Sequence, residues 1–283
     1  MKLGVLIPCR NEAAVIERKL ANLAHCEGAA AARVVVVDDG SEDDTAERAR
    51  AAGARLALEL RVVPNRERPG KPGALRSGLA ELAGCELLVL TDADVELDVR
   101  ALTELERAFE REPALAMACG AQHFTNGSTR YDRWTARVRR LESRFGALFS
   151  VHGQLLAWRT GLGLVPTLGM AADDLDLMLQ ARRKGRVRLV ASARFLEEKC
   201  APGVLADEQA LRRARAYVQL VRARHAPLSG LLGSLQWLFY RRVPLLVPAL
   251  PFARRSRTVR LIARAIELED RSSLPERWDM ARS

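Results

Sequence analysis

The first 120 residues alternate short apolar runs with segments of helical spacing, and this pattern predicts strands and helices in turn. Apolar runs of this length are typical of strands buried on both faces of a parallel sheet, and they occur near residues 3–7, 33–37, 55–63, 86–90 and 115–120. The intervening segments predict helices near residues 13–25, 43–52, 74–82 and 99–110. We therefore expect an α/β domain with a mainly parallel, doubly wound sheet and helices on both faces.

Polar residues before the first two helices predict where each begins. Asn11 is suited to cap the first helix, with Glu12 in its first turn. Ser41 precedes Asp44 by three residues, which approximates a capping box for the second helix.

The second half has longer and more basic helical segments. Its pattern predicts helices near residues 130–149, 173–184 and 204–224, and strands near residues 151–158 and 187–190. Residues 231–252 are apolar but interrupted by two arginines and three prolines, and the charged tail from Ala253 is expected to be peripheral. We expect a domain over residues 1–200 and a C-terminal helical extension over residues 201–283.

Charge and cysteine usage restrict the class of protein. The formal net charge is +10, and arginine dominates from Arg130 onward, so the surface should attract phosphorylated substrates, anionic lipid or nucleic acid. The five cysteines are scattered singly, which indicates reduced thiols in a cytosolic protein. We expect neither a signal peptide nor a spanning helix, because no run reaches the roughly 18 apolar residues that a membrane span needs.

Two aspartates follow the predicted strand at residues 86–90. Residues two apart in a strand point to the same face, so Asp92 and Asp94 would place two carboxylates where a parallel sheet binds its ligands. Like charges this close repel unless a divalent cation, brought in with a phosphate substrate, neutralises them. A solvated turn after the strand explains Asp-Ala-Asp equally well when the motif is taken alone.

A second pair, Asp38 and Asp39, follows the predicted strand at residues 33–37. If the two strands are neighbours in the sheet, four carboxylates converge, which suits a metal and a nucleotide. Gly70-Lys71-Pro72-Gly73 before a helix is a weak phosphate-binding signal, and an ordinary glycine- and proline-rich connection explains it as well.

Three aspartates, Asp173, Asp174 and Asp176, open a predicted helix. Capping and the helix dipole account for one or two carboxylates at this position. Three are more than a cap requires, so one of them could act as a general base that takes the proton of an acceptor hydroxyl.

The order of these motifs resembles the motif series of family 2 glycosyltransferases of the GT-A fold over residues 3 to about 190. The resemblance rests on Pro8-x-Arg10-Asn11-Glu12, Val36-Val37-Asp38-Asp39-Gly40-Ser41-x3-Thr45, Gly70-Lys71-x2-Ala74-Leu75-x2-Gly78, Thr91-Asp92-Ala93-Asp94, Gly153-x5-Arg159 and Asp173-Asp174-x-Asp176-Leu177. It implies an inverting transfer of a sugar from a nucleoside diphosphate sugar, with a UDP-sugar favoured, to a hydroxyl of a glycan or lipid-linked acceptor.

The resemblance also implies roles for individual residues. The resemblance implies that Asp94 and Asp92 bind Mg²⁺ or Mn²⁺. Asp94 would be the more direct ligand, and Asp92 would support the ribose or the donor sugar. Nucleotide contacts fall on Pro8, Asn11, Glu12, Asp39 and Lys71, and Gly153 matches the glycine near the donor sugar. Asp174 matches the catalytic base, but Asp173 stands where glutamate is usual, so the choice among Asp173, Asp174 and Asp176 stays open. Residues 1–120 then form the nucleotide-binding half and residues 121–200 the acceptor-side half.

The acceptor side carries a weaker resemblance. Gln209, Arg212 and Arg213 resemble a motif of processive members in which tryptophan stands at the position of Arg213, so we expect a non-processive enzyme. Residues 231–252 either pack as core or lie on an anionic membrane at the inner face of the cell membrane. No nucleic acid partner is expected. The alternatives are a sugar-phosphate nucleotidyltransferase and a non-catalytic, basic binding module.

Overall fold

The computed structural model describes residues 1–198, 204–223, 228, 230–246 and 256–271. Contacts divide the chain into an N-terminal unit, mainly residues 1–168 and 173–198, and a C-terminal unit that holds residues 169–172 and the helices from residue 204 onward. The fifth cysteine, Cys200, the last residue of the helix predicted near residues 204–224 and residues 247–252 of the apolar segment lie outside the described residues.

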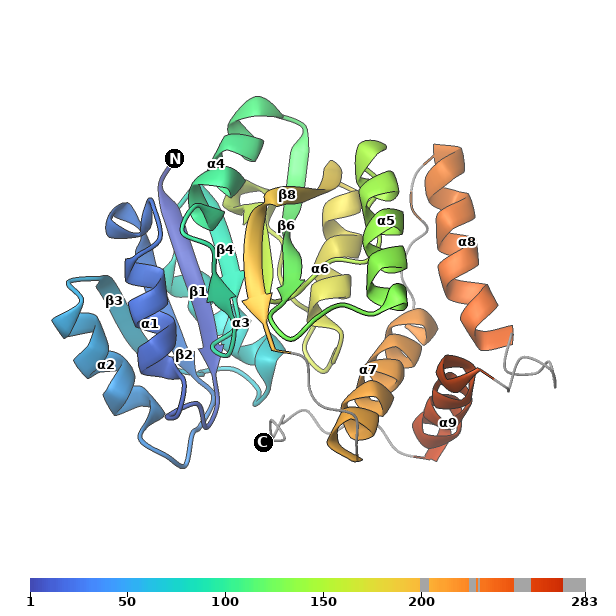
Figure 1. Cartoon of the computed structure of the whole chain (residues 1–283), viewed down its shortest axis with the longest axis horizontal. Helices are drawn as coiled ribbons and strands as arrows, with labels where there is room; N and C mark the ends of the chain where they lie inside the picture. The colour runs from blue at the N-terminus through green and yellow to red at the C-terminus, as the bar shows by residue number, and fades with distance from the viewer. Residues whose placement is uncertain (199–203, 224–227, 229, 247–255, 272–283) are drawn as a thin grey trace. The chain divides into compact units, whose positions relative to one another are not determined.

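An eight-stranded sheet forms the centre of the N-terminal unit (Figure 1), in the order β3-β2-β1-β4-β7-β6-β8-β5. Its strands are β1 (Leu3–Cys9), β2 (Arg33–Asp38), β3 (Glu59–Pro64), β4 (Leu87–Thr91), β5 (Glu96–Leu97), β6 (Leu115–Phe124), β7 (Leu155–Arg159) and β8 (Arg186–Glu197). Strands β3, β2, β1 and β4 pair in parallel, as do β6 and β8. The mainly parallel sheet is therefore confirmed, with β7 antiparallel to β4 and β6, and β5 antiparallel to β8.

The helices of this unit cover both faces of the sheet, because neighbouring strand residues point to opposite sides. They are α1 (Ile16–Ala24), α2 (Thr45–Arg55), α3 (Lys71–Glu81), α4 (Ala101–Arg111), α5 (Arg130–Arg144) and α6 (Asp173–Arg182). Val5 and Ile7 belong to the core shared with α1, α2 and α4, whereas Leu6 between them faces α3. At that contact a Cβ on Gly78 would overlap the Leu6 side chain, so glycine lets α3 lie close to the sheet.

The first two helices begin differently from the expectation. Asn11 does not cap α1, which starts at Ile16 without a side-chain cap, and Asn11 instead has a left-handed φ of 53°. Ser41 does not form a capping box with Asp44 either, because its hydroxyl donates to the Asp38 carboxylate. The Asn11 side chain instead accepts a hydrogen bond from the distant Glu42 amide, and the Ser41 hydroxyl bonds within its own turn.

The C-terminal unit contains three helices among its described residues: α7 (Val204–Arg222), α8 (Gly230–Leu246) and α9 (Arg257–Arg271). Helix α9 lies in the tail that was expected to be peripheral, yet it packs along α7 and buries Ala265. The Arg215 guanidinium of α7 also contacts the Glu269 carboxylate of α9 at 2.8 Å. None of the helices that the structure describes combines the length and the apolarity that crossing a membrane requires.

Candidate active site

Three elements bring charged side chains together at the carboxyl-terminal edge of the parallel strands. Lys71 is the first residue of α3, Asp92 follows the last residue of β4, and Asp173 is the first residue of α6. The Lys71 Nζ atom lies 2.8 Å from Oδ1 of Asp92 and 3.9 Å from Oδ2 of Asp173. Burial acts to lower the pKa of Lys71, but the two carboxylates outweigh it and raise that pKa, so the ammonium stays protonated.

The loop after β4 presents two carboxylates of different exposure. Asp92 is half-buried and accepts a hydrogen bond from Lys71, whereas Asp94 is exposed to solvent over the residue as a whole. Partial removal of its carboxyl group from water, together with the neighbouring Asp92, raises the pKa of Asp94. Protons and cations are therefore both favoured at this position.

The donor atoms of this loop suit a hard divalent cation that arrives with its substrate. Mg²⁺ usually takes one or two protein carboxylates plus phosphate oxygens, and Asp92 and Asp94 supply two such carboxylates. Within the described part of the chain, no group of three or more His, Cys, Asp or Glu side chains is placed to hold a metal ion. The residues present thus fit a cation whose coordination a diphosphate completes, and they do not form a complete cage of protein ligands.

The three aspartates at the start of α6 have distinct surroundings. Asp176 is buried, and its Oδ2 accepts hydrogen bonds from the Thr167 amide at 2.8 Å and from the Gln180 side chain at 3.1 Å. Asp174 is half-buried beside Gly153, where a Cβ on the glycine would lie 3.4 Å from its Oδ2. Asp176 therefore anchors the loop before the helix, which narrows the candidates for a base to Asp173 and Asp174.

Asp173 is a buried carboxyl group with a strongly altered acidity. Burial raises the pKa of Asp173 to about 7; Lys71 opposes this shift, while Asp174 and Asp92 add to it. Burial also raises the pKa of Asp174, again opposed by Lys71. Acidic groups with shifted pKa values that share one ammonium are typical of functional sites.

The paired aspartates after β2 do not join those after β4. Strand β1 lies between β2 and β4, so the convergence of four carboxylates that depended on neighbouring strands does not occur. The Asp38 carboxylate accepts a hydrogen bond from the Ser41 amide at 3.1 Å. The buried Asp39 carboxylate accepts from the Asn65 side chain at 2.6 Å and from the Gly70 amide at 2.8 Å. Asp39 therefore fixes the loop that carries Lys71.

The turn after β1 is tied to the turn after β2. The Asn11 Oδ1 atom accepts from the Glu42 amide at 2.8 Å, and the Glu12 amide donates to the Thr45 hydroxyl at 2.7 Å. Pro8, the half-buried residue before Cys9, lies at the same edge of the sheet. The first two motifs of the sequence are thus joined into one structure, and their nucleotide contacts stay a prediction.

The predicted acceptor-side residues Gln209, Arg212 and Arg213 lie on α7 in the C-terminal unit, and their role stays a prediction. The four described cysteines, Cys9, Cys26, Cys85 and Cys119, are buried and free, which agrees with reduced thiols.

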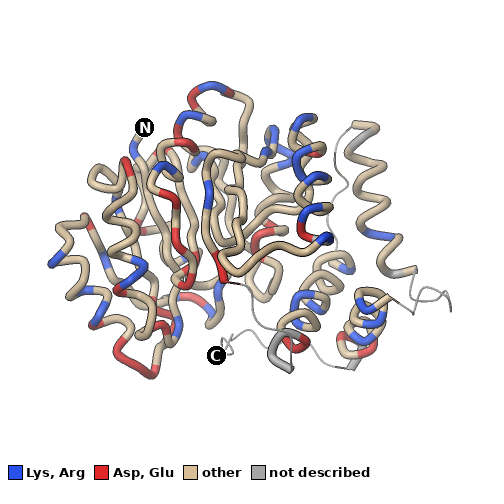
Figure 2. Tube along the Cα trace, in the orientation of Figure 1, with Lys and Arg blue, Asp and Glu red and all other residues tan. Residues whose placement is uncertain are grey.

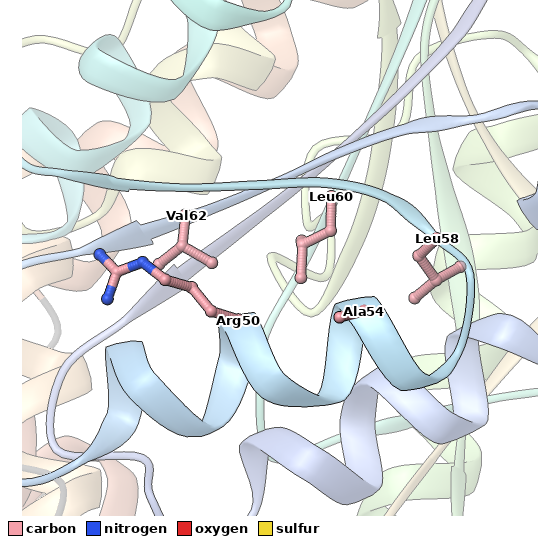
Figure 3. Close-up of a pocket in the computed structure, with 6 residues that line it drawn as sticks. Arg50, Ala54, Leu58, Leu60 and Val62 are labelled. Atoms are coloured by element: carbon pink, nitrogen blue, oxygen red, sulfur yellow. The ribbon is translucent and has the colours of Figure 1, made fainter.

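A pocket of about 340 Å³ lies elsewhere, between α2 and β3 (Figure 3). Its lining is aliphatic apart from one arginine, and consists of Arg50, Gly53, Ala54, Leu58, Leu60 and Val62. It contains no acidic side chain to hold a cation or to take a proton, so the candidate site remains the cluster around Lys71.

One buried charge near the site, that of Lys19, is not among the residues predicted from the sequence. Lys19 on α1 is 1% exposed, and its ammonium lies behind the Asp92–Asp94 loop, bonded to Thr91 and to Val95. Its position in the sequence carried a signal, because residue 19 falls on the face of the helix that contains Ile16, Leu20 and Leu23.

Comparison with known families decides the classification. The family described as Glycosyl transferase family 2 matches residues 4–161, which is more than half of the chain. The chain belongs to this family. The matched segment contains the loops that carry Asn11, Asp39, Lys71 and Asp92, together with Gly153.

Curated members of family 2 match parts of the chain. The glucosyl-3-phosphoglycerate synthase of Mycobacterium tuberculosis is 35% identical over 94 residues, which cover 33% of this chain and 29% of that protein. The undecaprenyl-phosphate 4-deoxy-4-formamido-L-arabinose transferase of Pseudomonas aeruginosa is 27% identical over 194 residues, which cover 68% of this chain and 50% of that protein. The chain thus spans half or less of the length of these relatives.

Solved structures of glycosyltransferases share the fold, which confirms the GT-A architecture. The mannosyltransferase PcManGT from Pyrobaculum calidifontis, solved with GDP-Man and Mn²⁺, superposes with a TM-score of 0.74 at 23% identity, over 97% of this chain and 77% of that one. TarS from S. aureus, solved with UDP-GlcNAc, gives 0.61 at 19% identity, over 94% and 81% of the two chains. The M. tuberculosis glucosyl-3-phosphoglycerate synthase with Mn²⁺, UDP and glucosyl-3-phosphoglycerate gives 0.56 at 21% identity, over 78% and 79%.

Proposed function

We propose that this family 2 protein transfers a sugar from a nucleoside diphosphate sugar, with a UDP-sugar favoured, to a hydroxyl of an acceptor, with inversion and without processive synthesis. The observation that carries the proposal is the ammonium of Lys71 held between Asp92 and Asp173. A positively charged side chain, the acidic loop after β4 and the aspartates at the start of α6 meet at one edge of the sheet. Ligands of such sheets bind at this edge.

The donor is proposed to lie across the loops at the ends of β1, β2 and β4. Pro8, Asn11, Glu12 and Asp39 would contact the nucleotide, as the family resemblance implies. Lys71 would bind the diphosphate as a point charge at the start of α3, where the helix dipole also favours an anion. Asp92 would support the ribose or the donor sugar, and Gly153 would leave room for that sugar beside Asp174.

A divalent cation, Mg²⁺ or Mn²⁺, is proposed to be held by Asp94 and, secondarily, by Asp92. When bound, such an ion neutralises charge that develops on a departing diphosphate. PcManGT and the mycobacterial synthase were each solved with Mn²⁺, which is consistent with this proposal. Lys71 would supply a second positive charge to the diphosphate, and it is already fixed in place by its two carboxylate partners.

In the proposed transfer step, Asp174 takes the proton of the acceptor hydroxyl. The acceptor oxygen forms a bond to the anomeric carbon from the face opposite the diphosphate, and the bond from that carbon to the diphosphate oxygen breaks with its electron pair. The acceptor proton passes to the Asp174 carboxylate, whose raised pKa makes it a stronger base than an exposed aspartate. Asp173, which lies nearer Lys71, is proposed to hold the lysine in place.

The acceptor is proposed to be a hydroxyl-bearing glycan or lipid-linked molecule, with Gln209, Arg212 and Arg213 on the acceptor side. The names of the two curated relatives above contain a phosphoglycerate and a polyprenyl phosphate. A basic protein suits acceptors that carry phosphate, and Lys and Arg recur along α5 and α7 (Figure 2). Membership of family 2 disfavours both the nucleotidyltransferase and the non-catalytic module.

We further propose a peripheral position on the inner face of an anionic membrane, through α8. This helix contains no acidic residue, and its side chains Leu231, Leu235 and Leu238 are more than half exposed. Apolar side chains beside arginines on one helix are typical of a membrane-surface segment.

Diphosphate release from a panel of UDP- and GDP-sugars, with and without Mn²⁺, tests the enzymatic proposal. We expect release from one donor, dependent on Mn²⁺ and lost in Asp94→Asn, while Asp44→Asn, at the exposed residue just before α2, behaves as the wild type. Before that assay, the rise in melting temperature with UDP or with GDP indicates which nucleotide the protein prefers. Full activity of Asp94→Asn in excess chelator would disprove metal-dependent transfer.

A further inference from the structure

Helix α1 holds the acidic loop after β4 from behind with two polar side chains three residues apart. The Lys19 Nζ atom donates to the Thr91 hydroxyl at 2.7 Å and to the Val95 carbonyl at 2.8 Å. The Asn22 side chain donates to the Leu97 carbonyl at 3.0 Å and accepts from the Leu97 amide at 2.8 Å. One face of the helix therefore bonds the Thr91 side chain before Asp92 and the backbone of Val95 and Leu97 after Asp94.

Lys19 is an unusual residue for this position. A buried ammonium is costly unless it is hydrogen-bonded or paired, and Lys19 is 1% exposed. Burial lowers the pKa of Lys19 to about 8, while Asp92 and Asp94 act to raise it, so the side chain remains mainly protonated at neutral pH. An apolar residue would fill the same place on the apolar face of α1 without this cost. We therefore look for the role of the charge in the loop that Lys19 contacts.

The two contacts of Lys19 lie on either side of the aspartates in this loop. Thr91 is the residue immediately before Asp92, and Val95 is the residue immediately after Asp94. A group bonded at both points fixes the path of the three residues between them. We propose that Lys19 is a positioning residue, which holds the Asp92–Asp94 loop in the conformation that presents both carboxylates to a cation and a diphosphate. This inference rests on the proposed function, because it concerns the ligands assigned there to the two aspartates.

The charge of Lys19 makes the test specific. Loss of a positive charge near two carboxylates strengthens cation binding by Coulomb attraction alone. A positioning role predicts the opposite result, because a disordered loop binds the cation less tightly. The direction of the change in Mn²⁺ affinity therefore separates the two roles.

The experiment uses the full chain with Lys19→Met, Thr91→Val and Thr91→Ser. The Kd of Mn²⁺ is measured by electron paramagnetic resonance with UDP or with GDP present, and amide hydrogen exchange of residues 91–97 is measured without any ligand. We expect Lys19→Met to raise the Kd about 10-fold or more and to speed the exchange. Thr91→Val should do so about 3-fold, and Thr91→Ser, which keeps the hydroxyl, should stay within about twofold, as expected for loss or retention of a single hydrogen bond.

Arg159→Met is a matched control. The Arg159 guanidinium also bonds two carbonyls, those of Phe109 at 2.6 Å and Leu115 at 3.3 Å, but it lies at the opposite end of the β4–β7 pair, where Arg159 pairs with Leu87. Its loss should lower the melting temperature and leave the Mn²⁺ affinity unchanged. The double variant Lys19→Met/Thr91→Val should bind Mn²⁺ no more weakly than Lys19→Met alone, because the two residues act through one contact.

Each outcome decides the inference. An unchanged or tighter Mn²⁺ affinity in folded Lys19→Met, with unchanged exchange at residues 91–97, overturns it. If Lys19→Met does not fold, equal affinities in Thr91→Val and Thr91→Ser overturn it instead. A wild-type protein that binds neither nucleotide with Mn²⁺ contradicts the proposed function, and the exchange measurement on the ligand-free protein still decides whether Lys19 orders the loop.

Discussion

The Nζ atom of Lys71 lies 2.8 Å from the Oδ1 atom of Asp92, so the first residue of α3 is joined to the end of β4. The same ammonium lies 3.9 Å from Asp173, at the start of α6. Without Lys71, the carboxylates of Asp92, Asp173 and Asp174 would face one another with no positive charge between them. The lysine is therefore both a proposed ligand of the diphosphate and a structural requirement of the acidic cluster.

We predict that Lys71→Met lowers kcat by about 100-fold or more, the size of effect seen when one donor to a developing negative charge is removed. The substitution removes the charge and also leaves Asp92 and Asp173 unpaired, so the affinity for the nucleoside diphosphate should fall as well. Steady-state turnover and calorimetric binding of UDP and GDP measure the two effects. Lys184→Met, at an exposed lysine of the same unit, is the control and should change neither.

The two aspartates Asp174 and Asp176 should respond to substitution in different ways. Asp174→Asn removes the proposed base and should lower kcat by about 100-fold or more with the fold intact. Asp176→Ala removes the acceptor of the Thr167 amide and the Gln180 side chain, so it should lower the free energy of unfolding by about 1–3 kcal/mol. Turnover per folded molecule, alongside urea denaturation, checks both. Equal losses of turnover in the two variants would contradict the assignment of the base.

The sheet and most helices could be predicted from sequence because their residues are buried in periodic patterns. Four consecutive valines in β2 are each completely buried, and such runs have few alternatives to a central strand. The start of α1 could not be predicted, since the Asn11 side chain bonds to the amide of Glu42, about 30 residues away in the chain. A local capping rule has no access to such a partner.

The sequence predicts Lys71, Asp92 and Asp173 as site residues, but it does not predict how they contact one another. The strand order decided that Asp38 and Asp39 stay apart from Asp92, because β1 lies between β2 and β4. No sequence pattern states which carboxylate a lysine will contact, so the joint contact of Lys71 with Asp92 and Asp173 appears only in three dimensions. Asp39, which was assigned to the nucleotide, also anchors the amide of Gly70.

Gly153→Ala should damage the site with little effect on the fold. A Cβ at this position would lie 3.1 Å from the Cβ of Asp174, which is tighter than most Cβ contacts, and 3.4 Å from its Oδ2, at the lower limit of ordinary contact. The Asp174 side chain must then shift by a few tenths of an ångström, and we expect kcat to fall about 10-fold or more because small misplacements of a catalytic group are costly. Gly161→Ala, where the added Cβ meets no atom within 4 Å, is the matched control. Full turnover of Gly153→Ala would show that this contact does not position Asp174.

Stability should depend on pH through Asp173. Burial raises the pKa of this carboxyl group to about 7, against about 3.9 in an unfolded chain. Between these values the folded protein keeps a proton that the unfolded chain has released, so the free energy of unfolding falls as pH rises from about 4 to about 7. The Asp173→Asn variant has no carboxyl group to titrate at this position. Its free energy of unfolding should therefore fall less between pH 5 and pH 8 than that of the wild type, by on the order of 2 kcal/mol. Chemical denaturation at both pH values measures it, and an identical fall in both proteins would contradict the prediction.

Helix α8 should bind anionic vesicles through its exposed leucines. Leu235 and Leu238 are each 56% exposed, and the arginines of this helix have no acidic neighbour within it. Insertion of each leucine into the headgroup region contributes on the order of 1 kcal/mol, so the double variant Leu235→Glu/Leu238→Glu should weaken binding to phosphatidylglycerol vesicles by about 10-fold or more. Val99→Glu, at a residue of the N-terminal unit that is 50% exposed, makes the same change outside α8 and should leave binding intact. Co-sedimentation with vesicles measures the binding of both variants.

Equal binding of the wild type and the double variant would contradict the proposed membrane contact. A dimer that forms without lipid and is lost in the double variant would show that these leucines contact a second copy of the chain.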